Sequence, residues 1–93
     1  MSGYKDRLVK LYRLSTDLMD KKLWDEAVEA LDQTIELSEE MQDPFFLEES
    51  RFRTALCCKI LGRQAEFLKQ KQMISPDKTF FIEDRALGLK DLG

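Results

Sequence analysis

The sequence predicts an all-α protein, built from two antiparallel helical hairpins and a C-terminal helix. Apolar residues recur at spacings of three and four along most of the chain, which is typical of helices with one buried face. No segment alternates between apolar and polar residues for long enough to indicate a strand. The dipeptides Asp43-Pro44 and Ser75-Pro76 each have the order of an N-cap followed by a first helical residue.

The first hairpin is expected over residues 4–41. Its first helix runs from Tyr4 to Met19 and ends near two lysines, whose charge suits the negative end of a helix dipole. Its second helix runs from about Leu23 to Met41, with Asp25 in the first turn. The buried stripe of this second helix is expected to comprise Trp24, Ala27, Val28, Leu31, Ile35 and Ser38, with Ala30 and Leu37 beside it.

The second hairpin is expected over residues 44–74. Its first helix begins at Pro44 with Asp43 as the N-cap, and it ends at Leu61, because Gly62 suits the left-handed position after a helix. The next helix covers roughly residues 63–74. A last helix is expected over residues 76–92, started by Pro76 after the Ser75 cap.

Length and composition predict a single domain over residues 1–93. A chain of this size buries only about 60–65% of its unfolded surface. The hydrophobic share of 43% and the charged share of 35% favour a folded globular chain over a disordered one. No apolar run approaches the ~18 residues of a membrane span, and the first residues show no apolar signal core. We therefore expect a cytoplasmic protein without membrane contact.

Charge is distributed unevenly around the net charge of −3. Residues 1–22 hold six basic and three acidic groups, residues 23–50 hold ten acidic groups and no Lys or Arg, and residues 51–93 hold nine basic and five acidic groups. We expect the acidic second helix to lie beside basic helices and to pair with them inside the molecule. The same acidic run would attract a basic partner.

Catalytic and metal-binding residues are scarce. The chain has no histidine, and its four glycines are too scattered for a phosphate-binding loop. The adjacent Cys57 and Cys58 point about 100° apart in a helix, so a disulfide between them is not expected, nor is a zinc site with only two thiols. One cysteine is expected in the core and the other nearer the surface. We expect no enzyme activity, no cofactor and no metal.

An internal repeat links the two hairpins. Leu11, Leu14, Ser15 and Leu18, followed by Leu23-Trp24-Asp25-Glu26-Ala27, resemble a tetratricopeptide repeat, with Trp24, Ala27, Leu31 and Thr34 at the positions of its second helix. A second copy, shifted by 40 residues, places Arg51, Thr54, Ala55 and Cys58 on the corresponding helix. The family's period is about 34 residues, so the connection between the repeats is longer here. An unrelated bundle of four or five helices is the alternative.

The resemblance implies a fragment of a right-handed superhelix, whose first and third helices line a groove for a partner's peptide or helix. Such repeats depend on their neighbours, so the segment Phe80-Phe81-Ile82 is expected to cap the open face of the fourth helix. A non-enzymatic adaptor or small chaperone is the implied function. The partner-binding residues expected from this geometry are Tyr4, Lys5, Leu8, Tyr12 and Arg13 on the first helix, and Phe45, Glu49, Phe52 and Arg53 on the third.

Two other functions compete with this one. The first is a self-associating structural or regulatory module, such as a homodimer. Its dimer contact is expected at the exposed edge of the fourth or fifth helix. The second is a regulator that binds nucleic acid through the basic stretch from Arg51 to Lys71, which the overall pI near 5.0 opposes.

Overall fold

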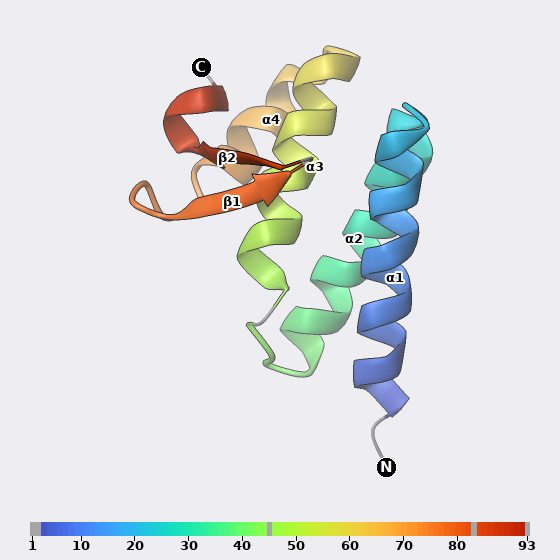
Figure 1. The fold of residues 1–93 in the computed structure, drawn as a ribbon. Helices are drawn as coiled ribbons and strands as arrows, with labels where there is room; N and C mark the ends of the chain where they lie inside the picture. The colour runs from blue at the N-terminus through green and yellow to red at the C-terminus, as the bar shows by residue number, and fades with distance from the viewer. Residues whose placement is uncertain (1–2, 45, 83, 93) are drawn as a thin grey trace.

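The computed structural model describes residues 3–44, 46–82 and 84–92, and it is mostly helical (Figure 1). Four helices come first: α1 (Gly3–Asp20), α2 (Trp24–Glu40), α3 (Leu47–Leu61) and α4 (Gln64–Lys71). Two antiparallel strands follow, β1 (Thr79–Ile82) and β2 (Arg85–Gly88), and a short 3-10 helix, η1 (Leu89–Leu92), comes last. Within these ranges no helix has the length and apolar character needed to cross a membrane.

The first three helices end in the same way. Each is followed by a residue in the left-handed backbone region: Lys22 (φ 61°), Gln42 (φ 53°) and Gly62 (φ 78°). This conformation turns the next N–H back onto the last turn of the helix. The closing hydrogen bonds, each 2.9 Å long, run from Leu23 to Leu18, from Asp43 to Ser38 and from Arg63 to Cys58. The prediction that α3 ends at Leu61 and is followed by Gly62 is confirmed.

The predicted start of α3 is wrong. The helix begins at Leu47 rather than Pro44, and Phe46 rather than Asp43 occupies the N-cap position. The backbone N–H of Asp43 is used to close α2, and its carboxylate lies 3.8 Å from the ammonium of Lys5 on α1. Asp43 therefore belongs to the end of α2 and to its contact with α1. The predicted site residue Phe45 lies outside the described residues.

The predicted C-terminal helix over residues 76–92 is also wrong, because this segment contains the β-hairpin. The β1 sequence Thr79-Phe80-Phe81-Ile82 consists of β-branched and aromatic residues, which favour strands. Its burial alternates: Phe80 and Ile82 are buried, whereas Phe81 is 71% exposed. Ser75-Pro76 starts a turn instead of a helix, closed by a hydrogen bond from the Lys78 N–H to the Ser75 carbonyl.

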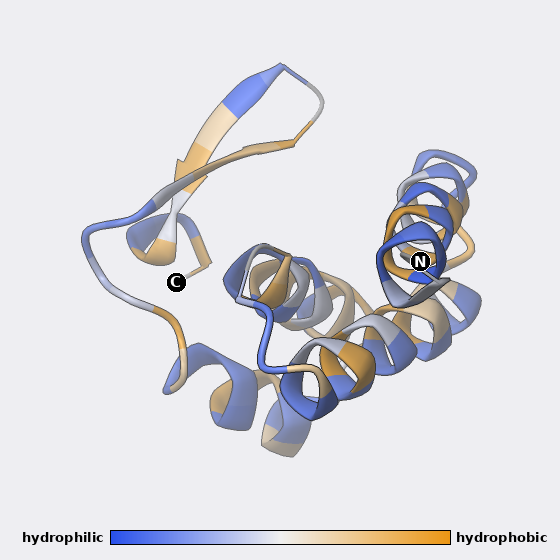
Figure 2. Cartoon of the chain, turned by 90° about the horizontal axis from the view of Figure 1, so that it is seen from below, coloured by the Kyte–Doolittle hydropathy of each residue, from blue (hydrophilic) through white to orange (hydrophobic). Residues whose placement is uncertain are grey.

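The helices and the hairpin form layers around α3. α2 packs against α1 on one side and α3 on the other, and α4 packs against α3. Figure 2 shows α3 between α1 and the hairpin. The ring of Phe80 stacks on that of Phe52, with centroids 4.8 Å apart, so the expected cap rests on α3 rather than on α4 alone.

The core joins all these elements. Its buried members are Met19, Ala27, Val28, Leu31, Phe52, Ala55, Cys57, Cys58, Phe67, Ile74, Phe80, Ile82 and Leu92. Both cysteines are fully buried free thiols, so the prediction of one near the surface is wrong. Burial raises the pKa of Cys57 to about 12, and it also raises that of Cys58.

The expected pairing of acidic α2 with basic residues is confirmed. Arg51 on α3 donates to the Glu39 carboxylate at 2.5 Å, and Arg63, just before α4, forms an ion pair with Asp25. The Arg51 side chain is largely buried, whereas Arg63 and Asp25 are exposed. Exposed pairs contribute little stability, at most about 1 kcal/mol each. These contacts fix α3 and α4 against α2.

Candidate protein-binding face between α1 and α3

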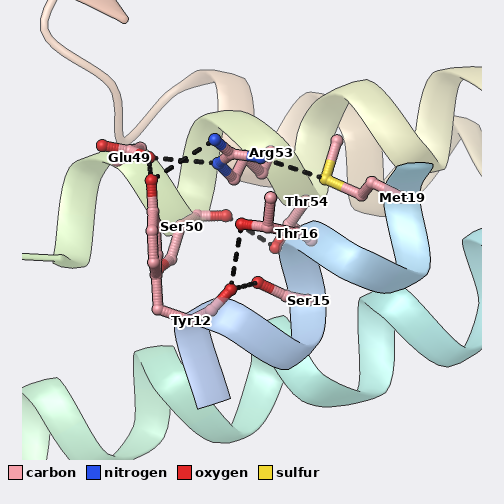
Figure 3. A network of polar contacts seen from close by, with 8 residues as sticks. All are labelled: Tyr12, Ser15, Thr16, Met19, Glu49, Ser50, Arg53 and Thr54. Atoms are coloured by element: carbon pink, nitrogen blue, oxygen red, sulfur yellow. Dashed lines mark hydrogen bonds and ion pairs between the residues drawn. The ribbon is translucent and has the colours of Figure 1, made fainter. Parts of the chain in front are cut away.

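Side chains connect α1 and α3 across the surface that faces away from α2 (Figure 3). The hydroxyl of Tyr12 on α1 donates a hydrogen bond to the carboxylate of Glu49 on α3. Arg53, one turn after Glu49, donates to that carboxylate from Nε at 3.1 Å and to the Tyr12 hydroxyl oxygen from Nη2 at 3.3 Å. We call Tyr12, Glu49 and Arg53 the α1/α3 bridge.

Apolar and sulfur contacts hold the bridge in place. The Tyr12 ring stacks on Phe46 with centroids 4.7 Å apart, and the guanidinium of Arg53 lies 5.3 Å from the Tyr12 centroid. Arg53 also donates to the sulfur of Met19 at 3.5 Å. Burial raises the pKa of Tyr12, and its hydrogen bond to Glu49 adds to this effect, while Arg53 opposes it. The phenol therefore stays protonated at neutral pH and remains the donor to Glu49.

Small hydroxyl residues lie on the helix surfaces beneath the bridge. Ser15 and Thr16 both donate to the Tyr12 carbonyl, at 2.7 and 3.0 Å, and Thr54 donates to the Ser50 carbonyl at 2.8 Å. Each hydroxyl is thus satisfied by its own helix and needs no partner from the neighbouring one. Ser15 and Thr54 are fully buried, which allows α1 and α3 to sit close to α2.

Two apolar hollows flank the bridge. The N-terminal hollow, about 140 Å³ in volume, is lined by Lys5, Leu8, Val9, Asp43 and Phe46. The C-terminal hollow, about 320 Å³ in volume, is lined by Met19, Trp24, Leu56, Ile60, Ile82, Arg85, Leu87 and Asp91. Val9 at the first hollow and Ile60 at the second are 37% and 50% exposed, so each hollow offers apolar surface to solvent.

The structure brings five of the expected binding residues to this face. Tyr12, Glu49 and Arg53 form the bridge, and Lys5 and Leu8 line the N-terminal hollow. Leu8 and Arg53 are almost fully buried, at 2% and 4% exposure. They therefore hold neighbouring residues of the face in place and offer little surface to a partner themselves.

Three other expected residues, Tyr4, Arg13 and Phe52, stand apart from the bridge. Tyr4 is half-buried near the start of α1, and Arg13 is exposed on the same helix. Phe52 is fully buried and stacks on Phe80, so it offers no surface to a partner. Its side chain belongs to the contact between α3 and the hairpin.

Several residues of this face were not among the expected ones. Phe46 stacks on Tyr12, Met19 contacts Arg53, and Trp24 and Ile60 line the C-terminal hollow. The Phe45-Phe46 pair in the sequence could have pointed to Phe46. The expected member of that pair, Phe45, lies outside the described residues, and Phe46 lies on the face.

The basic stretch from Arg51 to Lys71 does not form one free cationic surface. Arg51 and Arg63 are paired with carboxylates of α2, and Arg53 belongs to the bridge. The Lys59 ammonium donates to the Leu92 carbonyl at 2.6 Å. A nucleic-acid interface needs several cations directed at phosphates from one face, and these contacts direct them elsewhere.

Among the residues that the structure describes, no group of three or more Cys, Asp and Glu side chains is placed to hold a metal ion. No protein-family model, curated protein or solved structure matches this chain.

Proposed function

We propose that this chain is a non-enzymatic protein-binding adaptor or small chaperone, which holds a helix or an extended segment of its partner along the α1/α3 face. The observation that supports it best is the arrangement of two apolar hollows on either side of the α1/α3 bridge. Hollows of this type accept apolar side chains, and the polar groups between them fix the orientation of a bound segment.

The bridge is suited to this role because it is ordered before a partner arrives. Tyr12 and Arg53 hold the Glu49 carboxylate, and the Glu49 side chain remains 27% exposed. Binding to a preformed surface costs less conformational entropy than binding to a mobile one. An exposed carboxylate with a fixed position accepts hydrogen bonds from a basic side chain or from free backbone N–H groups of the partner.

The acidic residues of this chain favour a partner segment with positive charge. Of the ten acidic residues between positions 23 and 50, seven lie on α2, from which this face points away; Asp43 lies between α2 and α3, and Glu48 and Glu49 lie at the start of α3. Burial raises the pKa of Asp32 on α2, and repulsion from the carboxylates of Glu66 on α4 and Glu29 on α2 adds to this effect. A basic partner segment relieves that repulsion and associates faster at low ionic strength.

The repeat-like pattern supports the same assignment. In a tetratricopeptide-like arrangement the first and third helices line the groove. Here α1 and α3 carry the bridge, α1 contributes to both hollows, and α3 contributes to the C-terminal hollow. Ser15 and Ala27, which take small-residue positions of that pattern, are fully buried.

Capture from native cells with point variants tests the proposal. Val9→Asp places a charge in the N-terminal hollow and Ile60→Asp places one in the C-terminal hollow, and both positions are exposed enough for the fold to tolerate the change. Leu68→Asp on α4, where the side chain is 45% exposed away from this face, is the matched control. We expect the control to retain the captured partner and the two hollow variants to lose it. Equal capture by all three variants would refute the proposal.

A further inference from the structure

We propose that the groove between α1 and α2 binds an amphipathic helix of another protein, in which Lys or Arg side chains flank an apolar stripe. This groove is a second binding surface. None of its lining residues belongs to the α1/α3 bridge or to the two hollows beside that bridge. Its shape, its carboxylates and the spacing of its side chains all favour an occupant of this kind.

The groove has one apolar wall and one acidic wall. α1 and α2 run antiparallel, side by side (Figure 1), and the space between them has a volume of about 410 Å³. The wall on α1 consists of Leu11, Leu14 and Leu18. The wall on α2 consists of Glu26, Glu29 and Gln33, with Ala30 beside them. Because the side chain of Ala30 is small and 3% exposed, it does not fill the space between the two walls.

The leucine wall is apolar surface that the fold leaves in contact with solvent. Leu14 is 49% exposed, and Leu11 and Leu18 are half-buried. Of these three residues, Leu18 also packs against the core. A single exposed leucine is common on protein surfaces, but three along one edge of a groove form a strip that apolar side chains of a partner can cover.

The wall on α2 carries carboxylates that the chain itself does not neutralise. Glu39, on the same helix, is paired with Arg51 of α3. In contrast, no described residue forms an ion pair with Glu26 or Glu29. Both side chains are exposed at the groove, so they are available to cations of a partner. The same two carboxylates would repel an anionic lipid surface.

The charge of the groove changes toward the start of α1. There the groove continues into a hollow of about 260 Å³, lined by Arg7, Gln33, Glu36, Leu37 and Glu40. Arg7 already places a cation beside the carboxylates of this hollow, whereas no cation lines the groove at Glu26 and Glu29. We therefore expect the basic side chains of the partner helix to lie beside Glu26 and Glu29.

The spacing of both walls favours a helix over an extended strand. Residues recur at intervals of three and four positions, as Leu11, Leu14 and Leu18 on one wall and as Glu26, Glu29 and Gln33 on the other. At a rise of about 1.5 Å per residue, neighbouring leucines lie about 4.5–6 Å apart along the helix axis. A partner helix repeats its apolar stripe at the same interval, whereas a strand places side chains of one face about 7 Å apart. Helices that meet along such stripes pack as in a coiled coil.

Binding of two designed peptides to the intact chain tests the proposal. Each has about 18 residues, enough to form a helix, with leucines at heptad positions a and d. Positions e and g are lysines in one peptide and glutamates in the other. We expect fluorescence anisotropy at low salt to show binding of the lysine peptide alone. Leu14→Asp should weaken this binding about tenfold or more, while Leu68→Asp, at a leucine of similar exposure on α4, should not. No binding of the lysine peptide, or equal loss in both variants, would overturn the proposal.

A charge reversal tests the acidic wall. The double variant Glu26→Lys, Glu29→Lys should lose the lysine peptide and bind the glutamate peptide, a gain that unfolding cannot produce. The double variant Asp77→Lys, Asp84→Lys makes the same change in net charge at exposed positions outside the groove, and it should keep the wild-type preference. The wall would not be the recognition element if the first double variant still preferred the lysine peptide.

Two further measurements distinguish the groove from other sites. Val9→Asp, on the α1/α3 face, should leave binding of the lysine peptide unchanged. Loss of the peptide from Val9→Asp but not from Leu14→Asp would place it on the α1/α3 face and contradict the groove. Sedimentation of the wild type should show a monomer. A dimer that Leu14→Asp dissociates would mean that a second copy fills the groove in place of a separate partner.

Discussion

The carboxylate of Glu48, in the first turn of α3, accepts a hydrogen bond from the backbone N–H of Ser75 at 2.7 Å. The same carboxylate forms an ion pair with Lys78 at 3.0 Å, directly before β1. These two contacts attach the segment between α4 and β1 to the start of α3. They fix the position from which the hairpin reaches back to cover Phe52.

Glu48→Gln should destabilise the protein by about 1 kcal/mol near neutral pH, since it removes the charge from these hydrogen bonds. Slight burial opposes ionisation of Glu48, but the hydrogen bonds from Ser75 and Lys78 outweigh it and lower the pKa below 4.5. The stabilisation is therefore complete above about pH 4.5 and is lost as pH falls through the lower folded pKa. Urea unfolding of both proteins at a series of pH values measures the difference, with the exposed Glu40→Gln as control. A difference that persists unchanged at pH 3 would contradict this assignment.

Tyr12→Phe should cost about 1 kcal/mol of unfolding free energy. The change keeps the ring that stacks on Phe46 but removes the donor to Glu49 and the acceptor for Arg53. Tyr4→Phe, on the same helix but outside the bridge, should cost less. Because the pKa of Tyr12 is raised above 10.0, the wild type should lose this stabilisation as pH rises through the folded pKa, and the variant should not. Denaturant titrations at neutral and alkaline pH compare the three proteins, and equal losses for the two tyrosine variants would argue against the bridge.

Lys22→Gly should stabilise the protein by about 0.5–1 kcal/mol. Lys22 ends α1 with φ 61°, a left-handed conformation that costs most residues roughly 1 kcal/mol or more and costs glycine almost nothing. The neighbouring Lys21→Gly has no such strain to relieve and should be neutral or destabilising. Thermal unfolding of the two variants gives the comparison. If both substitutions lowered the melting temperature equally, the left-handed backbone conformation assigned to Lys22 at the end of α1 would be contradicted.

Cys57 and Cys58 should resist thiol reagents in the folded protein. Both side chains are fully buried, and burial raises both thiol pKa values, so little reactive thiolate is present or accessible. We expect modification by a disulfide reagent to follow the unfolding transition in denaturant, with both thiols reacting together. Rapid labelling in native buffer would show that α3 opens far more readily than its packing indicates.

The helical part of the fold was largely predictable because its signals are local. The apolar stripe of α2 predicted its bounds to within one residue and most of its buried residues, although Trp24 is only half-buried, and Gly62 marked the end of α3. The hairpin was missed because β1 has only four residues, too few for period-two alternation to stand out beside a Ser-Pro pair that resembles a helix start. Asp43 was misassigned because its N–H closes α2, a choice decided by the left-handed Gln42 rather than by the Asp-Pro dipeptide.

The proposed binding face was only partly predictable. The tetratricopeptide-like geometry expected from the sequence pointed to Tyr12, Glu49 and Arg53, but the contact between these residues depends on how α1 and α3 pack against α2. Tyr12 and Glu49 are 37 positions apart in the chain, and no local pattern specifies that their side chains touch. Phe52 carries the same kind of apolar signal as Phe46, yet it turns toward the hairpin, whose strands were not predicted.

Mapping backbone amide shifts by NMR, at low salt and with a captured partner segment, tests the central claim most directly. We predict that the amides around the two hollows, including those of Val9, Tyr12 and Ile60, shift on addition of the segment, while those on the exposed surface of α4 near Leu68 do not. Increasing salt should reverse these shifts if the acidic residues attract the partner. Shifts confined to α4 or to the hairpin, with α1 and α3 unchanged, would contradict a binding face between α1 and α3.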